Sequence, residues 1–261
     1  LDHPGPMVRT VADCAIVMNV ISGYDPKDPT SANLPAPDFT NNLKTGIKGL
    51  RIGVPREFFD VPLQPDVAKS TQDAISLLTE LGADVREVSW PNFYDVVIMG
   101  HIISMVEASA NYGWMGKALD SETAAQVVRA LPRLETGLFV AATDYLKAQQ
   151  LRHSYTVASH KLMDGLDILA GPTMPMTAFP ITREEIELSG KTLPVETAIP
   201  TYTRPFNHNG FPCVTVPCGF SSDGLPIGLQ LAGKPYEDAT VLRAAYAYEQ
   251  STEWHLRRPP V

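Results

Sequence analysis

The chain has 261 residues, of which 44% are hydrophobic and 19% are charged, and this composition excludes a chain that stays disordered. Its 29 acidic and 21 basic residues give a net charge of −8, which argues against a general nucleic-acid-binding protein. Three scattered cysteines make no disulfide framework, and no leader-like or membrane-spanning apolar run is found. We therefore expect a soluble protein of the reducing cytoplasm, without nucleic-acid or membrane partners.

The predicted elements of the first half begin with a helix over residues 10–22. Thr10 is its expected N-cap, and Gly23 its stop. Next comes a β-α-β unit, which implies a parallel pair of strands. Its segments are a strand over 50–55, an amphipathic helix over 66–81 and a strand over 83–88.

The second half predicts more helices, followed by an antiparallel hairpin. The order of elements favours an α/β fold with a mixed, partly parallel sheet flanked by helices. We expect one domain over residues 1–261 with no internal boundary. The expected segments are a helix-rich region over 94–131, a helix over 143–164 capped by Thr143, a strand over 166–170, an irregular region over 180–205, strands over 213–216 and 226–231, and a closing helix over 237–254.

Searches for familiar catalytic and cofactor motifs are negative. The sequence has no glycine-rich nucleotide loop, no H-E-x-x-H and no G-x-S-x-G. Its histidines lack the carboxylate pattern of a zinc site, so we predict no metal and no cofactor. Ser189 and Lys191 form the one close serine–lysine arrangement, but their polar surroundings predict a surface turn with a protonated lysine. Cys213 and Cys218 are interpreted as small buried residues on opposite faces of a strand.

Three segments could carry a binding function. The first is Gly-Pro-Thr-Met-Pro at 171–175, directly after a strand, where α/β sheets collect ligands. There Thr173 could offer a hydroxyl between walls formed by Met174 and Met176, although a plain strand exit explains the segment equally well. The second, residues 203–212, contains Asn207 and is more simply a structural loop. In the third, residues 224–231, Gly228 predicts a close approach within a strand.

Six segments in this order resemble the amidase signature family, and the resemblance covers the whole chain. They include Asp-His-Pro-Gly-Pro at 2–6, which opens the first of them, and Asn-His-Asn-Gly-Phe-Pro at 207–212, which is the fifth. The matching segments are residues 2–13, 23–31, 50–57, 171–175, 207–212 and 224–230.

The resemblance implies an amide hydrolase in which a serine attacks the amide carbonyl. A second serine relays the proton to an unprotonated lysine, and a Gly/Ser-rich loop holds the oxyanion. In the family these groups precede the segment that residues 2–6 match, so no catalytic residue is assigned here. We expect the chain to be a C-terminal portion that contributes pocket residues and has the remaining N-terminal portion as its partner. The pocket residues are Thr173, Met174, Met176 and Asn207.

The substrate implied is a small-molecule amide, and two alternatives stay open. The first is the glutaminase subunit of a tRNA-dependent amidotransferase, a branch that carries an aspartate ahead of the Asn-x-x-Gly-x-Pro motif. Residues 198–205 contain no acid at that place. The second is a non-catalytic scaffold or binding protein, and a homo-oligomer is possible in either case. If strands of the same sheet lie upstream, we expect an unpaired strand edge and exposed apolar helix faces.

Overall fold

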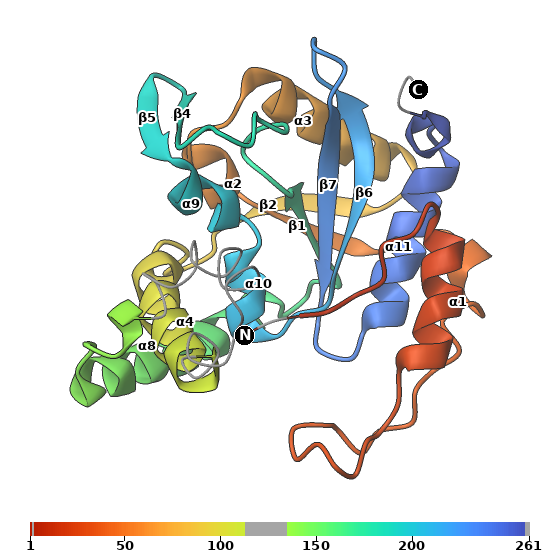
Figure 1. Cartoon of the computed structure of the whole chain (residues 1–261). Coiled ribbons are helices and arrows are strands. Elements are labelled where there is room, and N and C mark those ends of the chain that lie inside the picture. The colour runs from red at the N-terminus through yellow and green to blue at the C-terminus, as the bar shows by residue number, and fades with distance from the viewer. Residues whose placement is uncertain (2, 113–134, 259–261) are drawn as a thin grey trace.

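The computed structural model describes residues 1, 3–112 and 135–258, and a five-stranded sheet lies at its centre (Figure 1). The order of the strands is β2-β1-β3-β7-β6. β1 runs parallel to both β2 and β3, whereas β7 is antiparallel to β3 and to β6. The mixed, partly parallel α/β sheet is therefore confirmed. The strands are β1 (Arg51–Pro55), β2 (Asp84–Val88), β3 (Ile168–Pro172), β6 (Cys213–Phe220) and β7 (Pro226–Gly233).

Helices flank this sheet. α1 and α11 lie side by side, and α4 packs on α8 at the other end of the molecule (Figure 1). None of the described helices is long and apolar enough to cross a membrane. The helices are α1 (Val11–Ile21), α2 (Glu57–Asp60), α3 (Pro65–Glu80), α4 (Asp95–Tyr112), α8 (Ala142–Leu162), α9 (Val195–Ala198), α10 (Arg204–Asn209) and α11 (Asp238–Gln250), with short 3-10 turns at Leu43–Thr45, Ile199–Thr201 and Trp254–Leu256.

The β-α-β unit forms as its apolar pattern predicts. α3 begins with Pro65, whose missing N–H would have no helical partner at that position. It buries Val67, Ala74 and Leu78 at helical spacing. Thr10 also caps α1 as expected, because its Oγ1 accepts a hydrogen bond from the N–H of Asp13 at 3.1 Å.

Three local predictions are wrong. Residues 180–205 are not irregular throughout, because strands β4 (Glu185–Leu188) and β5 (Lys191–Pro194) form a separate two-stranded sheet followed by α9. Thr143 is not a cap, since α8 begins one residue earlier and has Ala141 at its N-cap. Asn207 lies on α10 rather than in a loop, and Gly210 ends that helix with a left-handed φ of 74°. Part of the helix-rich region expected over 94–131 lies outside the described residues.

The two edges of the central sheet differ in character. β2 carries the charged residues Asp84, Arg86 and Glu87, which protect an edge against further pairing. β6 has eight residues and no charge, and within the described chain it pairs with β7 alone. The exposed apolar helix face expected from the sequence is also present, on α1. Its outer residues Ile16, Val20 and Ile21 are 57%, 80% and 61% exposed.

Candidate functional site

Thr173 lies immediately after the carboxyl end of β3, next to β7 and β6. Its N–H donates to the carbonyl of Gly228 at 3.1 Å. Its Oγ1 is 3.2 Å from Oγ1 of Thr215 on β6, and either hydroxyl can donate. Gly228 is the close approach that the sequence predicts, because a Cβ there would lie 2.7 Å from Cγ2 of Thr215 and 3.0 Å from Oγ1 of Thr173. The missing side chain thus lets the two threonines meet above β7.

We expect Gly228→Ala to lower the free energy of unfolding by about 1–3 kcal/mol, the usual range for an added group in a packed site. The methyl group must displace Thr215 or Thr173 and break their hydroxyl contact. Urea denaturation followed by circular dichroism measures the loss. Gly5→Ala is the control, since a Cβ at Gly5 would meet nothing within 4 Å. Equal stability of the two variants would contradict the tight packing around Gly228.

Met174 and Met176 point into a small hydrophobic cluster beneath the β4–β5 hairpin. Met176 is buried, and Met174 packs against the cluster while partly exposed. The other buried members are Ile186, Leu188, Val195 and Ala198. The methionines therefore give the Thr173 turn an apolar base, and strand β4 and helix α9, neither of which the sequence predicted, supply the other buried members of that base.

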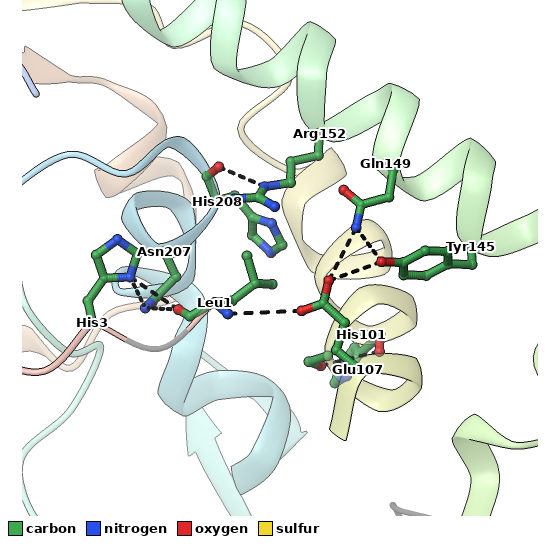
Figure 2. Close-up of polar contacts among 10 residues, drawn as sticks. Leu1, His3, His101, Glu107, Tyr145, Gln149, Arg152, Asn207 and His208 are labelled. Carbon is green, nitrogen blue, oxygen red and sulfur yellow. Dashed lines mark hydrogen bonds and ion pairs between the residues drawn. The ribbon is translucent and has the colours of Figure 1, made fainter. Parts of the chain in front are cut away.

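Asn207 belongs to a polar group at the junction of α10, α4, α8 and the first residues of the chain (Figure 2). Its Nδ2 donates to the carbonyl of Leu1 at 2.9 Å and lies 3.2 Å from Nδ1 of His3. On the α4–α8 side, Glu107 accepts hydrogen bonds from Tyr145 at 3.1 Å and from Gln149 at 3.3 Å. Asn207 therefore anchors Leu1 and His3, which precede the Gly-Pro at positions 5 and 6.

Asn207 and Thr215 both line a cavity of about 620 Å³, whereas Thr173 and the two methionines do not. The structure thus connects Thr173 to the cavity through Thr215 and places Met174 and Met176 behind it. Glu249 also lines the cavity, but its Oε2 already accepts a hydrogen bond from the N–H of Val11 at 2.9 Å. The remaining walls come from residues 3–11, Cys14, Met18, Thr203, Phe206, residues 211–217, Gln230, Asp238, Val241 and Leu242.

A cluster of buried aromatic side chains packs around Phe58, next to the segments that match the family. No pattern noted in the sequence pointed to it. Phe58 is at its centre, with ring centroids 5.5 Å from Phe93, 5.6 Å from Tyr202 and 6.0 Å from Trp90. The hydroxyl of Tyr202 donates to the carbonyl of Phe58 at 2.9 Å. A Cβ at Gly171 would lie 2.1 Å from the Phe58 ring. Segment 171–175 and the residues ahead of Asn207 therefore meet on the ring of Phe58, which directly follows segment 50–57.

Ser189 and Lys191 form no catalytic pair. Ser189 lies in the turn of the β4–β5 hairpin with a φ of 51°, and its hydroxyl donates to the carbonyl of Leu63 at 3.3 Å. Lys191 is exposed on β5. The prediction of a turn is therefore confirmed.

The thiols offer no activated nucleophile. Burial raises the pKa of Cys218 to about 12 and also raises the pKa of Cys14. Cys218 is buried as predicted, whereas Cys213 is exposed, contrary to the prediction. Among the described residues, no group of three or more His, Cys, Asp or Glu side chains could hold a metal ion.

Comparison with family models matches residues 1–242 to the family described as Amidase. The chain is 40% identical to a glutamyl-tRNA(Gln) amidotransferase subunit of Chloroflexus aggregans, over 99% of this chain and 56% of that protein. It is also 40% identical to an amidase of Pseudomonas putida, over 99% of this chain and 55% of that protein. The chain thus spans about half the length of the curated relatives it matches.

Solved structures agree with these matches. A bacterial aryl acylamidase of the amidase signature family aligns with a TM-score of 0.82 at 26% identity, over 99% of this chain and 57% of that one.

The two sequence alignments differ in length, with 281 positions for the amidotransferase protein and 262 for the amidase. Since both cover 99% of this chain, the amidase aligns with fewer insertions.

Proposed function

Because this chain belongs to the amidase signature family, we propose that it is the C-terminal portion of an enzyme that hydrolyses the C–N bond of a small-molecule amide. The observation that carries the proposal is the family match over residues 1–242 together with the polar groups at Thr173 and Asn207. In this proposal the chain supplies one side of the substrate pocket, and the remaining portion supplies the nucleophile.

The proposed pocket side suits a neutral amide. A hydroxyl such as that of Thr173 both donates and accepts, and the side-chain amide of Asn207 does the same, so each can pair with an amide C=O or N–H. Met174 and Met176 add a polarisable apolar base under Thr173. Hydrogen bonds of this kind orient the substrate, while cleavage needs a nucleophile and a base held elsewhere.

A neutral amide is favoured over glutamine by two observations. Residues 198–205 offer no carboxylate ahead of Asn207 to hold the amino group of glutamine. The alignment with the Pseudomonas putida amidase also needs fewer insertions than that with the amidotransferase protein. The glutaminase role stays the second candidate, because this chain is 40% identical to the amidotransferase protein and 40% identical to the amidase. A non-catalytic scaffold derived from an amidase is the third.

The isolated chain is expected to show no turnover of glutamine or of a panel of small neutral amides. A chimera that carries the uncovered part of the Pseudomonas putida amidase ahead of Leu1 is expected to hydrolyse a neutral amide, measured as released ammonia. Preferred hydrolysis of glutamine would favour the glutaminase role instead. A folded but inactive chimera would favour the scaffold.

Ser189→Ala and Lys191→Ala are expected to leave the activity of the chimera unchanged within about twofold, because the Ser189 hydroxyl already donates to the carbonyl of Leu63 and Lys191 is an exposed side chain of β5. Thr173→Val is the contrasting variant and is expected to raise KM by about tenfold through the loss of one hydrogen bond. Turnover by the isolated chain that survives both Ser189→Ala and Lys191→Ala would contradict the proposal, since another nucleophile would then exist within residues 1–261.

A further inference from the structure

We propose that Gln230 is a specificity-determining residue, whose side-chain oxygen accepts a hydrogen bond from the N–H of the substrate amide. The inference rests on the proposed function, because it takes the cavity beside Asn207 as part of the pocket for a small-molecule amide. It goes further by naming the class of amide that this pocket selects, namely primary and N-monosubstituted amides, which keep an N–H.

Gln230 lies in the middle of β7, a strand with a neighbour on each side. It is paired with Gly171 of β3 and with Thr215 of β6. Its side chain is only 4% exposed, yet it lines the cavity of about 620 Å³ that Asn207 and Thr215 also line. Residues directly opposite each other in a sheet carry their side chains on the same face. Gln230 and Thr215 are therefore neighbours on the face of the sheet that borders the cavity.

The nitrogen of the Gln230 side chain is fixed by the protein itself. Nε2 donates to the carbonyl of Tyr202 at 3.0 Å. Tyr202 is fully buried, and its own hydroxyl donates to the carbonyl of Phe58 at 2.9 Å. Since a carbonyl oxygen only accepts, the amide of Gln230 must face Tyr202 with Nε2 rather than with Oε1. The contact therefore sets which way the side-chain amide is turned.

The oxygen of the same side chain is left for a ligand. Oε1 of Gln230 accepts no hydrogen bond from the part of the chain that the structure describes. A polar side chain in the interior of a sheet costs free energy unless its groups are paired, and a methionine of similar size would avoid that cost. A fixed acceptor without a protein partner, on the wall of a cavity, therefore indicates a ligand that donates a hydrogen bond.

The chemistry of this acceptor differs from that of the hydroxyls nearby. The hydroxyls of Thr173 and Thr215 both donate and accept, so they can pair with an N–H or with a carbonyl. Oε1 of Gln230 only accepts, and the donor that a neutral amide offers is its N–H. The matching ester and the N,N-disubstituted amide have no N–H and would leave Oε1 unpaired. A site built to pair with a donor rejects such analogues for this reason.

The test compares a primary amide with the methyl ester of the same acid, both hydrolysed by the chimera with the Pseudomonas putida amidase. Gln230→Met is expected to lower the ratio of kcat/KM for the amide to that for the ester by about tenfold, through one lost hydrogen bond. The intrinsic reactivities of the two substrates cancel when the variant is compared with the original chimera. Gln72→Met, at an exposed glutamine of α3, is the matched control and is expected to leave the ratio unchanged. An equal loss for amide and ester would assign Gln230 a structural role and overturn the inference.

A second measurement needs no substitution and no turnover. The original chimera is expected to bind the amide about tenfold more tightly than the ester. Inhibition constants against a third substrate report this in an active chimera, and calorimetry reports it in an inactive one. Tighter binding of the amide by an inactive chimera supports the inference while rejecting the proposed function. Equal affinity for the two compounds, or binding of neither, overturns the inference.

Discussion

Replacement of Phe58 by alanine is expected to lower the free energy of unfolding by about 3–5 kcal/mol, the range for a buried phenylalanine. Phe58 is 1% exposed and makes edge contacts with Phe93, Tyr202 and Phe206. Its removal leaves a cavity whose walls come from distant segments, so the walls cannot easily close. Phe59→Ala is the matched control, since the next residue is only partly buried and is expected to lose less.

Gly171→Ala tests the same contact from the opposite side. A Cβ at Gly171 would lie 2.1 Å and 2.5 Å from Cδ2 and Cε2 of Phe58, and a ring fixed on several sides cannot move away. We expect a loss of about 1–3 kcal/mol or more. In the double variant, the cavity left by Phe58→Ala accepts the new methyl group, so the combined loss is expected to be smaller than the sum of the two.

Urea denaturation of the four proteins in this cycle measures the coupling. The two substitutions are expected to be non-additive by about 0.5–3 kcal/mol, as for residues in contact. Additive losses, or a Phe59→Ala loss as large as that of Phe58→Ala, would contradict a central role for Phe58. Such a role explains the glycine at 171, because a strand residue with a side chain would push Phe58 off its aromatic neighbours.

Strong periodic patterns made much of the fold predictable. α3 buries a stripe of residues at helical spacing between two short strands, and both the helix and the strands lie within a few residues of their predicted bounds. The β4–β5 hairpin was missed because its four-residue strands are half polar and lie among prolines. Its readable signal was the alternation Glu-Ile-Glu-Leu ahead of Ser-Gly, a dipeptide typical of turns.

The candidate site was less predictable than the fold. Thr173 could be placed from the sequence, since it follows a strand directly. The contacts of Asn207 with Leu1 and His3 join residues more than 200 positions apart, and no local pattern encodes them. The same holds for Phe58, whose neighbours come from separate segments of the chain. Pro205 near the start of α10 and Gly210 after its end were local signals that could have identified that helix.

Acidification is expected to destabilise the protein through His208, a side chain only 2% exposed beside α4 and α8. Neither ring nitrogen has a hydrogen-bond partner among the described residues. Burial lowers the pKa of His208 to about 4, with further contributions from Arg152, Arg204 and the terminal amine of Leu1. Figure 2 shows the ring close to Arg152, whose Nε donates to the His208 carbonyl at 3.1 Å.

The direction of the pH effect on stability follows from which state, folded or unfolded, binds the proton. A folded-state pKa below the ordinary 6.5 means that, under acid conditions, the unfolded chain binds a proton that the folded chain does not. His208 therefore adds no pH dependence to the stability above about pH 6.5, and its unfavourable contribution grows as the pH falls toward about 4. At 1.36 kcal/mol for each pKa unit, the loss reaches about 3 kcal/mol and stays constant below pH 4.

His208→Gln and His208→Asn, which cannot titrate, isolate this contribution. Each variant is expected to lose about 3 kcal/mol less stability than the original chain between pH 7 and pH 4, measured by urea denaturation at each pH. The carboxylates titrate alike in all three proteins, so the difference between the curves reports His208 alone. Parallel curves would show that the imidazole is protonated within the fold, and the two arginines would then have to move away from it, because a buried cation between them would be repelled by both.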